Sequence, residues 1–304
     1  MKKPAATLPF MGATKSKTPM GFDAVIFGAP HGTPYKGIDN RVHAGAAKAF
    51  RDALAADAEW LDHWDYDLGG RLLEGGFRLA DLGDLATTPK DGAGNRKRIE
   101  AATRRILDSG AIPIMFGGDD STPIPFIAGF AGGPPLTILQ IDAHIDWRDE
   151  RYGERNGFSS TMRRASEQPH VWRIVQAGAR GLGSARVREI AEARQWGAHI
   201  VTAGDIHRDG IGAVLAHIPE ESGCLISLDC DALDVSQMAA VAYPSPGGLT
   251  FTQATGLIAG VAAKARIAGF TMVEFVPARD RDGTAAFTAA RLACNVIGRL
   301  ARRR

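Results

Sequence analysis

Three acidic motifs contain the residue types in this chain that are best suited to chemistry. They read GGDDS at residues 117–121, DAHID at 142–146 and SLDCDALD at 227–234, and each follows an apolar run of strand length. If these motifs meet at one edge of a sheet, their carboxylates repel one another strongly unless positive charge lies between them. The motifs therefore predict a site for divalent cations.

The spacing within the motifs favours two cations that share ligands. Asp142, His144 and Asp146 alternate along the chain, as do Asp229 and Asp231, so each set presents its side chains on one face of an extended segment. Carboxylates and imidazole form the donor set expected for manganese and its neighbours. Two cations about 3.5–4 Å apart can share carboxylates and lower the pKa of a water between them, which suits the pair to hydrolysis.

Each motif also has a purely structural interpretation when it is taken alone. DAHID fits a loop with capping carboxylates, and SLDCDALD fits a calcium site or a strand that ends in solvent. GGDDS fits a tight turn before a helix. The occurrence of all three motifs at predicted strand ends favours a shared metal site over three separate structural roles.

Short apolar runs alternate with helix-like segments along the whole chain. Runs such as LTILQI at 136–141 are typical of strands that are covered on both faces of a parallel sheet. The eight runs lie at 24–28, 77–82, 112–116, 136–141, 173–178, 198–202, 224–228 and 270–275. Helices are predicted at 43–56, 95–108, 184–196, 252–264 and 285–303. The alternation predicts one α/β domain over residues 21–304, preceded by a flexible segment at 1–20.

The acidic motifs follow the third, fourth and seventh apolar runs, and Glu274 lies at the end of the eighth. Active sites of open parallel sheets gather beyond the carboxyl ends of the strands. We therefore expect these four segments to converge on one site.

Composition limits the classes of partner and the compartment. A net charge of +2 over 304 residues gives no electrostatic reason to expect a nucleic-acid partner. The N-terminal residues lack the apolar core of a signal peptide, no stretch has the length and apolarity of a membrane span, and three cysteines show no paired spacing. We expect a cytoplasmic protein without membrane or nucleic-acid partners.

Four motifs together make the chain resemble the ureohydrolase family of arginases, agmatinases and guanidino-acid amidinohydrolases, with an agmatinase-like pattern. They are FGGDDS at 116–121, DAHID at 142–146, SLDCDALD at 227–234 and VEFVPARD at 273–280. The resemblance implies a three-layer α/β/α sandwich around an eight-stranded, mostly parallel sheet. It also implies a homo-oligomer, either a trimer or a hexamer.

The activity implied by the resemblance is hydrolysis of a small guanidino compound to urea and an amine, with two Mn²⁺ per subunit and Ni²⁺ or Co²⁺ as alternatives. Asp142 and Asp229 would bridge the metals, and Glu274 would receive the guanidinium. The implied metal ligands are Asp120, Asp142, His144, Asp146, Asp229 and Asp231. The implied catalytic residues are Asp142, Glu274 and Asp234, the last of which would help to position the metal-bound hydroxide.

Asp120 departs from the family pattern, because most relatives have a histidine ligand at this place. Five ligand carboxylates would then face a formal charge of +4 from two divalent ions. Three outcomes are open: Asp120 binds a metal and raises the pH optimum, it leaves one metal site weak, or it marks a chain that no longer hydrolyses its substrate. We favour the first outcome.

A second departure is Asn156, where many relatives have a histidine that contacts the substrate. Asn156, His31, Arg148 and Glu274 are the expected substrate contacts, and a structural role in a turn is an equal alternative for His31. An arginine of the loop after Asp146, such as Arg148 or Arg151, would favour a substrate with an acidic tail through a bidentate pair. The alternative is that these long side chains are solvated. Amine-tailed and neutral guanidines remain open. Two rival functions are a non-catalytic regulatory subunit and a metal-dependent amide deacetylase.

Overall fold

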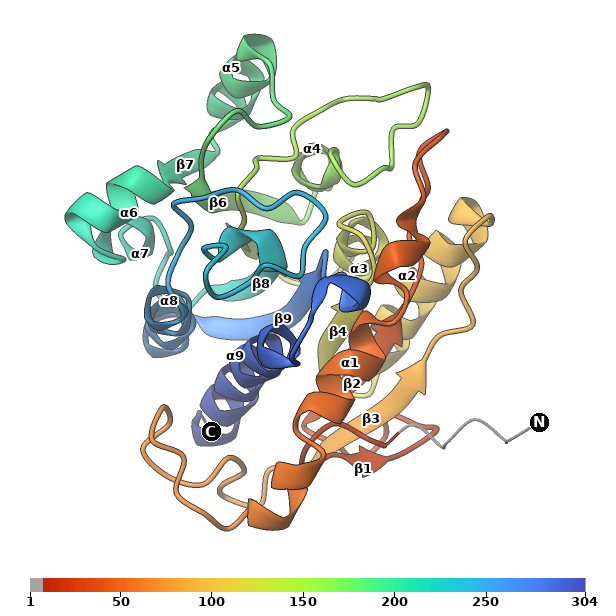
Figure 1. Cartoon of the computed structure of the whole chain (residues 1–304), viewed down its shortest axis with the longest axis vertical. Coiled ribbons are helices and arrows are strands. Elements are labelled where there is room, and N and C mark those ends of the chain that lie inside the picture. The colour runs from red at the N-terminus through yellow and green to blue at the C-terminus, as the bar shows by residue number, and fades with distance from the viewer. Residues whose placement is uncertain (1–7, 304) are drawn as a thin grey trace.

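The computed structural model describes residues 8–303, which form one nine-stranded sheet between two layers of helices (Figure 1). Every paired strand is parallel to its neighbour, and the strand order is β1-β3-β2-β4-β9-β8-β5-β6-β7. The strands are β1 (Thr14–Lys15), β2 (Ala24–Ala29), β3 (Leu79–Asp84), β4 (Ile112–Gly117), β5 (Leu136–Ile141), β6 (Val171–Ala179), β7 (His199–Thr202), β8 (Gly223–Asp229) and β9 (Arg266–Val273).

The predicted α/β class is confirmed, and all eight predicted runs form strands. The ninth strand, β1, pairs with β3 at the edge of the sheet. It was missed because its two residues are polar and exposed, so no apolar run marks it.

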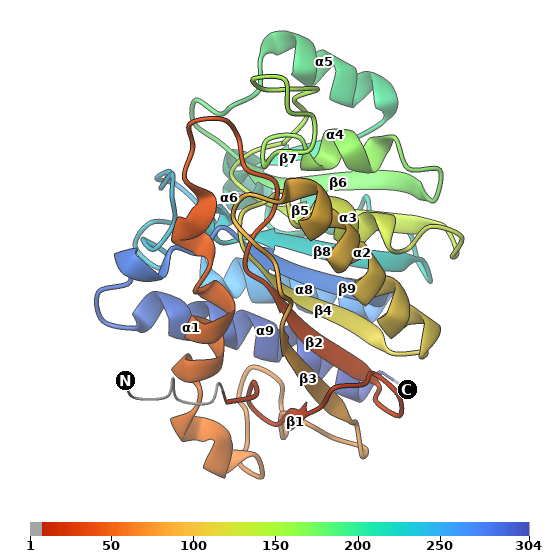
Figure 2. The ribbon, with the colours of Figure 1, turned by 90° about the vertical axis from the view of Figure 1, so that its right-hand side faces the viewer.

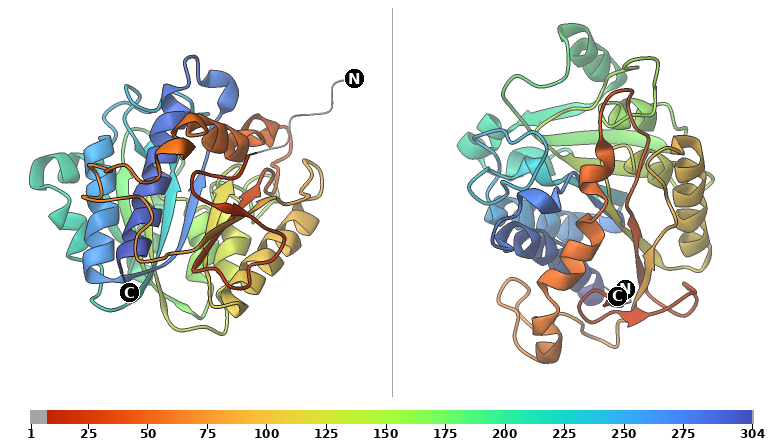
Figure 3. Two further views of the ribbon diagram at one scale, coloured as in Figure 1. Left: turned by 90° about the horizontal axis from the view of Figure 1, so that it is seen from below. Right: turned by 45° about the vertical axis from the view of Figure 1, so that its right-hand side comes forward.

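Helices cover both faces of the sheet (Figures 2 and 3). One face packs against α1 (Ala46–Ala53), α6 (Ala203–Asp209), α7 (Gly212–Leu215), α8 (Phe251–Lys264) and α9 (Thr284–Arg302). The other packs against α2 (Gly92–Asp108), α3 (Pro123–Ala128), α4 (Thr161–Ser166) and α5 (Val187–Trp196). The 3-10 helices are η1 (Asn40–His43), η2 (Ala56–Trp60), η3 (Cys230–Ala232) and η4 (Pro277–Arg279). The helices α3, α4, α6 and α7 were not predicted, because they are too short to show a helical period.

Alternate residues of each central strand enter two separate cores. In β2, Val25 and Phe27 pack on the α2 side, whereas Ile26 packs on the α9 side. Both sets are fully buried, as the continuous apolar runs predict for a parallel sheet with two covered faces.

Four strands precede the three acidic motifs and Glu274, and we call these four stretches the acidic segments. The four strands are neighbours in the sheet, in the order β4-β9-β8-β5. Their ends are also level, since Phe116 pairs with Met272, Leu228 with Met272, and Ile141 with Leu228. A parallel sheet places all carboxyl ends at the same edge, so this order brings the four segments together.

Part of the segment expected to be flexible packs against the domain. Residues 1–7 lie outside the described residues, but Phe10 is fully buried and its N–H donates to Asp81 Oδ2 at 2.9 Å. The rings of Phe10 and Phe116 lie 5.2 Å apart. The segment at 1–20 was expected to be flexible, but Phe10 within it is packed against the domain.

Within residues 8–303, no helix is both long enough and apolar enough to cross a membrane.

Candidate metal centre and substrate cavity

A cavity of about 340 Å³ opens at the carboxyl ends of the four central strands, and acidic residues line its base. This size suits a small molecule. The expected site residues on its walls are Asp120, His144, Asp146, Arg148, Asp229, Asp231 and Glu274. The structure thus brings together residues from all four acidic segments, as the strand-end positions predict.

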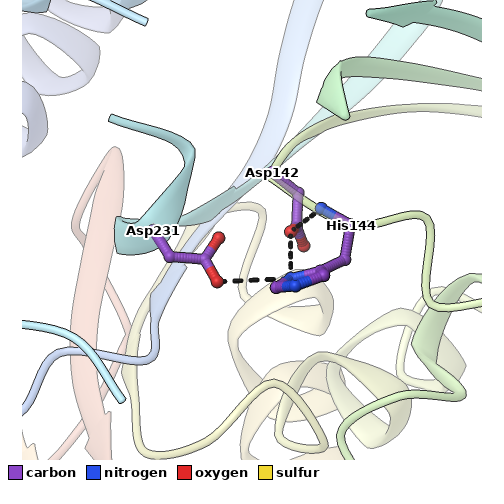
Figure 4. Close-up of side chains that lie close together, drawn as sticks. All are labelled: Asp142, His144 and Asp231. Atoms are coloured by element: carbon purple, nitrogen blue, oxygen red, sulfur yellow. Dashed lines mark hydrogen bonds and ion pairs between the residues drawn. The ribbon is translucent and has the colours of Figure 1, made fainter. Parts of the chain in front are cut away.

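The first group of potential ligands consists of Asp142, His144 and Asp231, whose donor atoms all lie within 4.8 Å of one another. His144 Nδ1 is 3.4 Å from Asp142 Oδ1 and 3.2 Å from Asp231 Oδ2 (Figure 4). The backbone holds both carboxylates, because His144 N–H donates to Asp142 Oδ1 at 2.7 Å and Ala143 N–H donates to Asp231 Oδ1 at 3.2 Å. The strand ends of β5 and β8 are therefore joined at this point.

The second group consists of Asp120, Asp142 and Asp229, again with donor atoms within 4.8 Å of one another. Asp142 belongs to both groups, which is the arrangement that a bridging carboxylate needs. Asp120 Oδ2 is buried and has no hydrogen-bond partner among the described residues. Such an unsatisfied buried oxygen is costly in a protein interior, and a cation at this place would satisfy it.

The electrostatics of the cluster also fit a cation site. Burial raises the pKa of Asp120, Asp146 and Asp229 well above the usual range, and the charges of neighbouring carboxylates raise it further. Burial would lower the pKa of His144, but hydrogen bonds to Asp142 and Asp231 and their charges raise it to about 12. Protons or metal cations must therefore neutralise the cluster.

Two glutamines orient carboxylates of the candidate ligands. Gln140 Nε2 donates to Asp142 Oδ2 at 2.8 Å and to Asp146 Oδ2 at 2.6 Å. Gln176, its partner in the β5–β6 register, donates to Gln140 Oε1 at 2.5 Å. Side chains that hold metal ligands in this way fix ligand geometry. The two residues were not predicted, although an amide in the otherwise apolar run LTILQI is a signal that could have found Gln140.

Glu274 is held on the cavity wall from two directions. Its Oε1 accepts the Asp120 N–H at 2.8 Å, and its Oε2 lies 3.4 Å from His43 Nε2. His43 is anchored in turn, with Nδ1 3.2 Å from the Phe275 carbonyl oxygen. Burial raises the pKa of Glu274 to about 7, against the opposing effect of His43. His43 belongs to η1 and lies 231 residues before Glu274, so no local pattern indicates the contact.

Backbone strain marks the same site. Four non-glycine residues in the described chain have a positive φ, and two of them are Asp146 at 43° and Glu274 at 64°. This conformation is unfavourable for residues with a side chain and occurs often at functional sites, where surrounding contacts hold it. The contacts of Gln140 and His43 supply that support here.

The glycines of GGDDS allow the close approach of neighbouring segments to Asp119 and Asp120. A Cβ atom on Gly117 would lie 2.7 Å from Val273 Cγ1, and one on Gly118 would lie 2.5 Å from the Pro30 carbonyl oxygen. Both distances are too short for a side chain, so the turn that carries Asp120 requires glycine at these two positions.

Four expected site residues are not among those lining the cavity: Asp142, Asp234, Asn156 and His31. Asp142 is buried beside the cavity and belongs to both groups of potential ligands. The Asp234 carboxylate accepts hydrogen bonds from Ser236 and from the N–H groups of Gly247 and Gly248, which lower its pKa to about 2. These bonds give Asp234 a turn-forming role and do not support the expected role in positioning the nucleophile. Asn156 instead donates to Glu154 Oε1, and His31 Nδ1 contacts the Thr87 hydroxyl at 3.1 Å.

Residues 22–298 match the family described as the Arginase family. The chain is 28 % identical over 296 residues to the mitochondrial guanidino acid hydrolase of Homo sapiens, a match that covers 95 % of this chain and 82 % of that protein. It is 30 % identical over 230 residues to guanidinopropionase of Pseudomonas aeruginosa, covering 74 % and 72 %. The fold is that of proclavaminate amidinohydrolase of Streptomyces clavuligerus, with a TM-score of 0.85, 24 % identity and coverage of 98 % and 99 %.

Fold and site define an α/β protein with a candidate metal centre, and the named relatives are hydrolases. The chain belongs to the arginase family. The predicted resemblance to ureohydrolases and the predicted hydrolase class are confirmed by this match.

Proposed function

We propose that this protein hydrolyses a guanidino compound to urea and an amine at a site that holds two manganese ions. The observation that carries the proposal is the position of Asp142, which contributes to two ligand groups, beside the cavity that Glu274 lines. Family relatives named for guanidino substrates support the same activity.

The residues present fit a pair of divalent cations. Asp142 and Asp229 are the proposed bridging ligands, and the unsatisfied Oδ2 of Asp120 is the proposed ligand that replaces the family histidine. The remaining ligands are His144, Asp146 and Asp231. When bound, two adjacent cations would supply a nucleophile by lowering the pKa of a water.

Glu274 is the proposed binding group for the guanidinium. Its two carboxylate oxygens retain free lone pairs after accepting from Asp120 N–H and contacting His43, so they can accept two further N–H groups of a planar cation. A bound guanidinium would also favour the ionised form of this carboxylate, whose pKa burial raises to about 7. The carboxylate thereby orients the guanidinium carbon toward the metal ligands at the base of the cavity.

Metal analysis combined with a urea assay tests the proposal. Purified protein incubated with Mn²⁺ should retain about two ions per chain and release urea from at least one member of a panel of guanidino compounds. Asp229→Asn should reduce both metal content and urea release. The matched control is Asp209→Asn, because Asp209 is exposed and pairs with Arg208 at the end of α6.

Two results would count against the proposal. Retention of two ions without urea release from any compound would favour a non-catalytic binding or regulatory subunit. Retention of no ion, or of one, would show that Asp120 does not complete a second metal site.

Light scattering on the same preparation tests the expected trimer or hexamer.

A further inference from the structure

We propose that the substrate carries a carboxylate at the end opposite its guanidinium, and that Arg148 and Arg151 bind this carboxylate. The inference rests on the proposed function, in which Glu274 binds the guanidinium end of the substrate. Both arginines line the same cavity as the acidic cluster, and they are half-buried whereas its carboxylates are buried. The cavity therefore has a negative base and a positive side, which fits a ligand of opposite polarity.

The two arginines differ from their neighbours in the same stretch of chain, because their charges are not compensated by an acidic residue. Arg155, Arg163 and Arg164 form ion pairs whose acidic partners are Asp149, Glu167 and Glu192. Within the described residues, neither Arg148 nor Arg151 has an acidic group within 4.0 Å. The arginines that face the cavity are thus the ones that lack an anion.

Arg148 is partly satisfied by the protein and partly free. Its Nη2 donates to the Ser184 carbonyl oxygen, which fixes the direction of the guanidinium. Its Nε is buried and has no hydrogen-bond partner among the described residues. A half-buried guanidinium with unused donors is unfavourable unless an anion pairs with it, and a carboxylate matches its planar donor set.

Arg151 is held by aromatic contacts that leave its donors available. Its guanidinium carbon lies 5.5 Å from the centre of the Tyr35 ring and 5.1 Å from that of Tyr152. Tyr35 is itself buried, and its hydroxyl lies 2.7 Å from the hydroxyl of Ser159, which lines the cavity. Cation–π contacts position a guanidinium without using its N–H groups, which can then bind a ligand.

The charge of this wall also excludes other tails. An ammonium group, as in agmatine, would lie beside two guanidinium groups and be repelled. The α-amino group of arginine would meet the same repulsion beside its carboxylate. The favoured substrate class is therefore an ω-guanidino acid that has no α-amino group.

The test compares compounds that share the guanidinium and differ in the tail: 4-guanidinobutyrate, butylguanidine, agmatine and arginine. With Mn²⁺-loaded protein, kcat/KM for urea release should be about 10- to 100-fold higher for 4-guanidinobutyrate than for butylguanidine, as a charge-assisted bidentate contact implies. Agmatine should be the poorest substrate. Arg148→Gln and Arg151→Gln should each lower the ratio of kcat/KM for the acid to kcat/KM for butylguanidine by about 10-fold or more.

Arg155→Gln is the matched control, since Arg155 lies on the same loop but pairs with Asp149 outside the cavity. Its kinetics should equal those of the unmodified protein for all four compounds. Equal turnover of the acid and butylguanidine, a preference for agmatine, or an equal loss for all compounds in Arg148→Gln would overturn the inference about the tail.

Calorimetric binding of the same compounds separates this inference from the proposed function. The acid should bind to the metal-loaded protein at least about tenfold more tightly than butylguanidine, and Arg148→Gln should abolish the difference. This binding result without any urea release would support the carboxylate contact and refute the hydrolytic function. Equal binding, with urea released, would refute the carboxylate contact alone.

Discussion

Replacing Asp120 by asparagine should stabilise the metal-free protein while weakening metal binding. The substitution keeps the shape of the side chain and removes one charge from a buried group whose donor atoms lie within 4.8 Å of Asp142 and Asp229. At 4.8 Å and an effective dielectric of about 20, each pair of like charges repels by about 3.5 kcal/mol. The unmodified protein avoids part of this repulsion by taking up a proton.

Proton uptake sets an upper limit on the stability gain. An unfolded aspartate has a pKa of about 3.9, so holding it protonated at pH 7 costs at most about 4 kcal/mol, and at pH 5 at most about 1.5 kcal/mol. The pKa of Asp120 is raised in the folded protein, chiefly by burial, so its contribution to stability is fully present below pH 4 and is lost as the pH rises. Asp120→Asn should therefore gain up to about 4 kcal/mol at pH 7 and much less at pH 5.

Metal binding should change in the opposite direction. Loss of a residue that merely supports a metal ligand costs about 10- to 100-fold in affinity, so loss of a ligand should weaken binding of one Mn²⁺ by at least about 100-fold. Urea-induced unfolding of the metal-stripped protein at both pH values, with calorimetric titration of Mn²⁺, measures the two effects. Asp209→Asn controls for the loss of a negative charge. An Asp120→Asn protein with unchanged stability at pH 7 and two equally tight Mn²⁺ sites would refute the reasoning.

Three further predictions concern the rest of the site. His43→Ala should raise KM for a guanidino substrate by about tenfold, because Glu274 loses the imidazole that contacts its Oε2. Two Mn²⁺ should still bind, and loss of metal would instead assign His43 to the ligand shell. The free energy of unfolding of the metal-free protein should fall between pH 5 and pH 8, because burial raises the pKa of Asp146 and Asp229. Saturating Mn²⁺ should remove this pH dependence. Equal slopes with and without Mn²⁺ would contradict a cation site. Asp234→Ala should lower the free energy of unfolding by about 1–3 kcal/mol in urea, because the hydrogen bonds that the carboxylate accepts are lost. The affinity for Mn²⁺ should be unchanged. Loss of activity at full stability would instead restore the catalytic assignment of Asp234.

The amino-acid sequence alone determined the class of fold and most of the candidate ligand set. Apolar runs marked all eight of the longer strands, and they are most continuous in the central strands, because burial on both faces of a parallel sheet leaves no room for polar alternation there. The alternation in DAHID indicated a shared ligand face, and the structure places Asp142 and His144 together with Asp231. Local spacing was sufficient for these features because each lies within a few residues of a strand end.

Only the tertiary structure decided which distant residues support the site and which expected residues stay outside it. The order β4-β9-β8-β5 places the acidic segments side by side, and this order depends on how helices pack across the sheet. The same packing brings His43 to Glu274, whereas the turn around residues 234–248 holds Asp234 away from the cavity. No local pattern encodes these contacts, because they join segments that are distant in sequence or depend on the path of a loop.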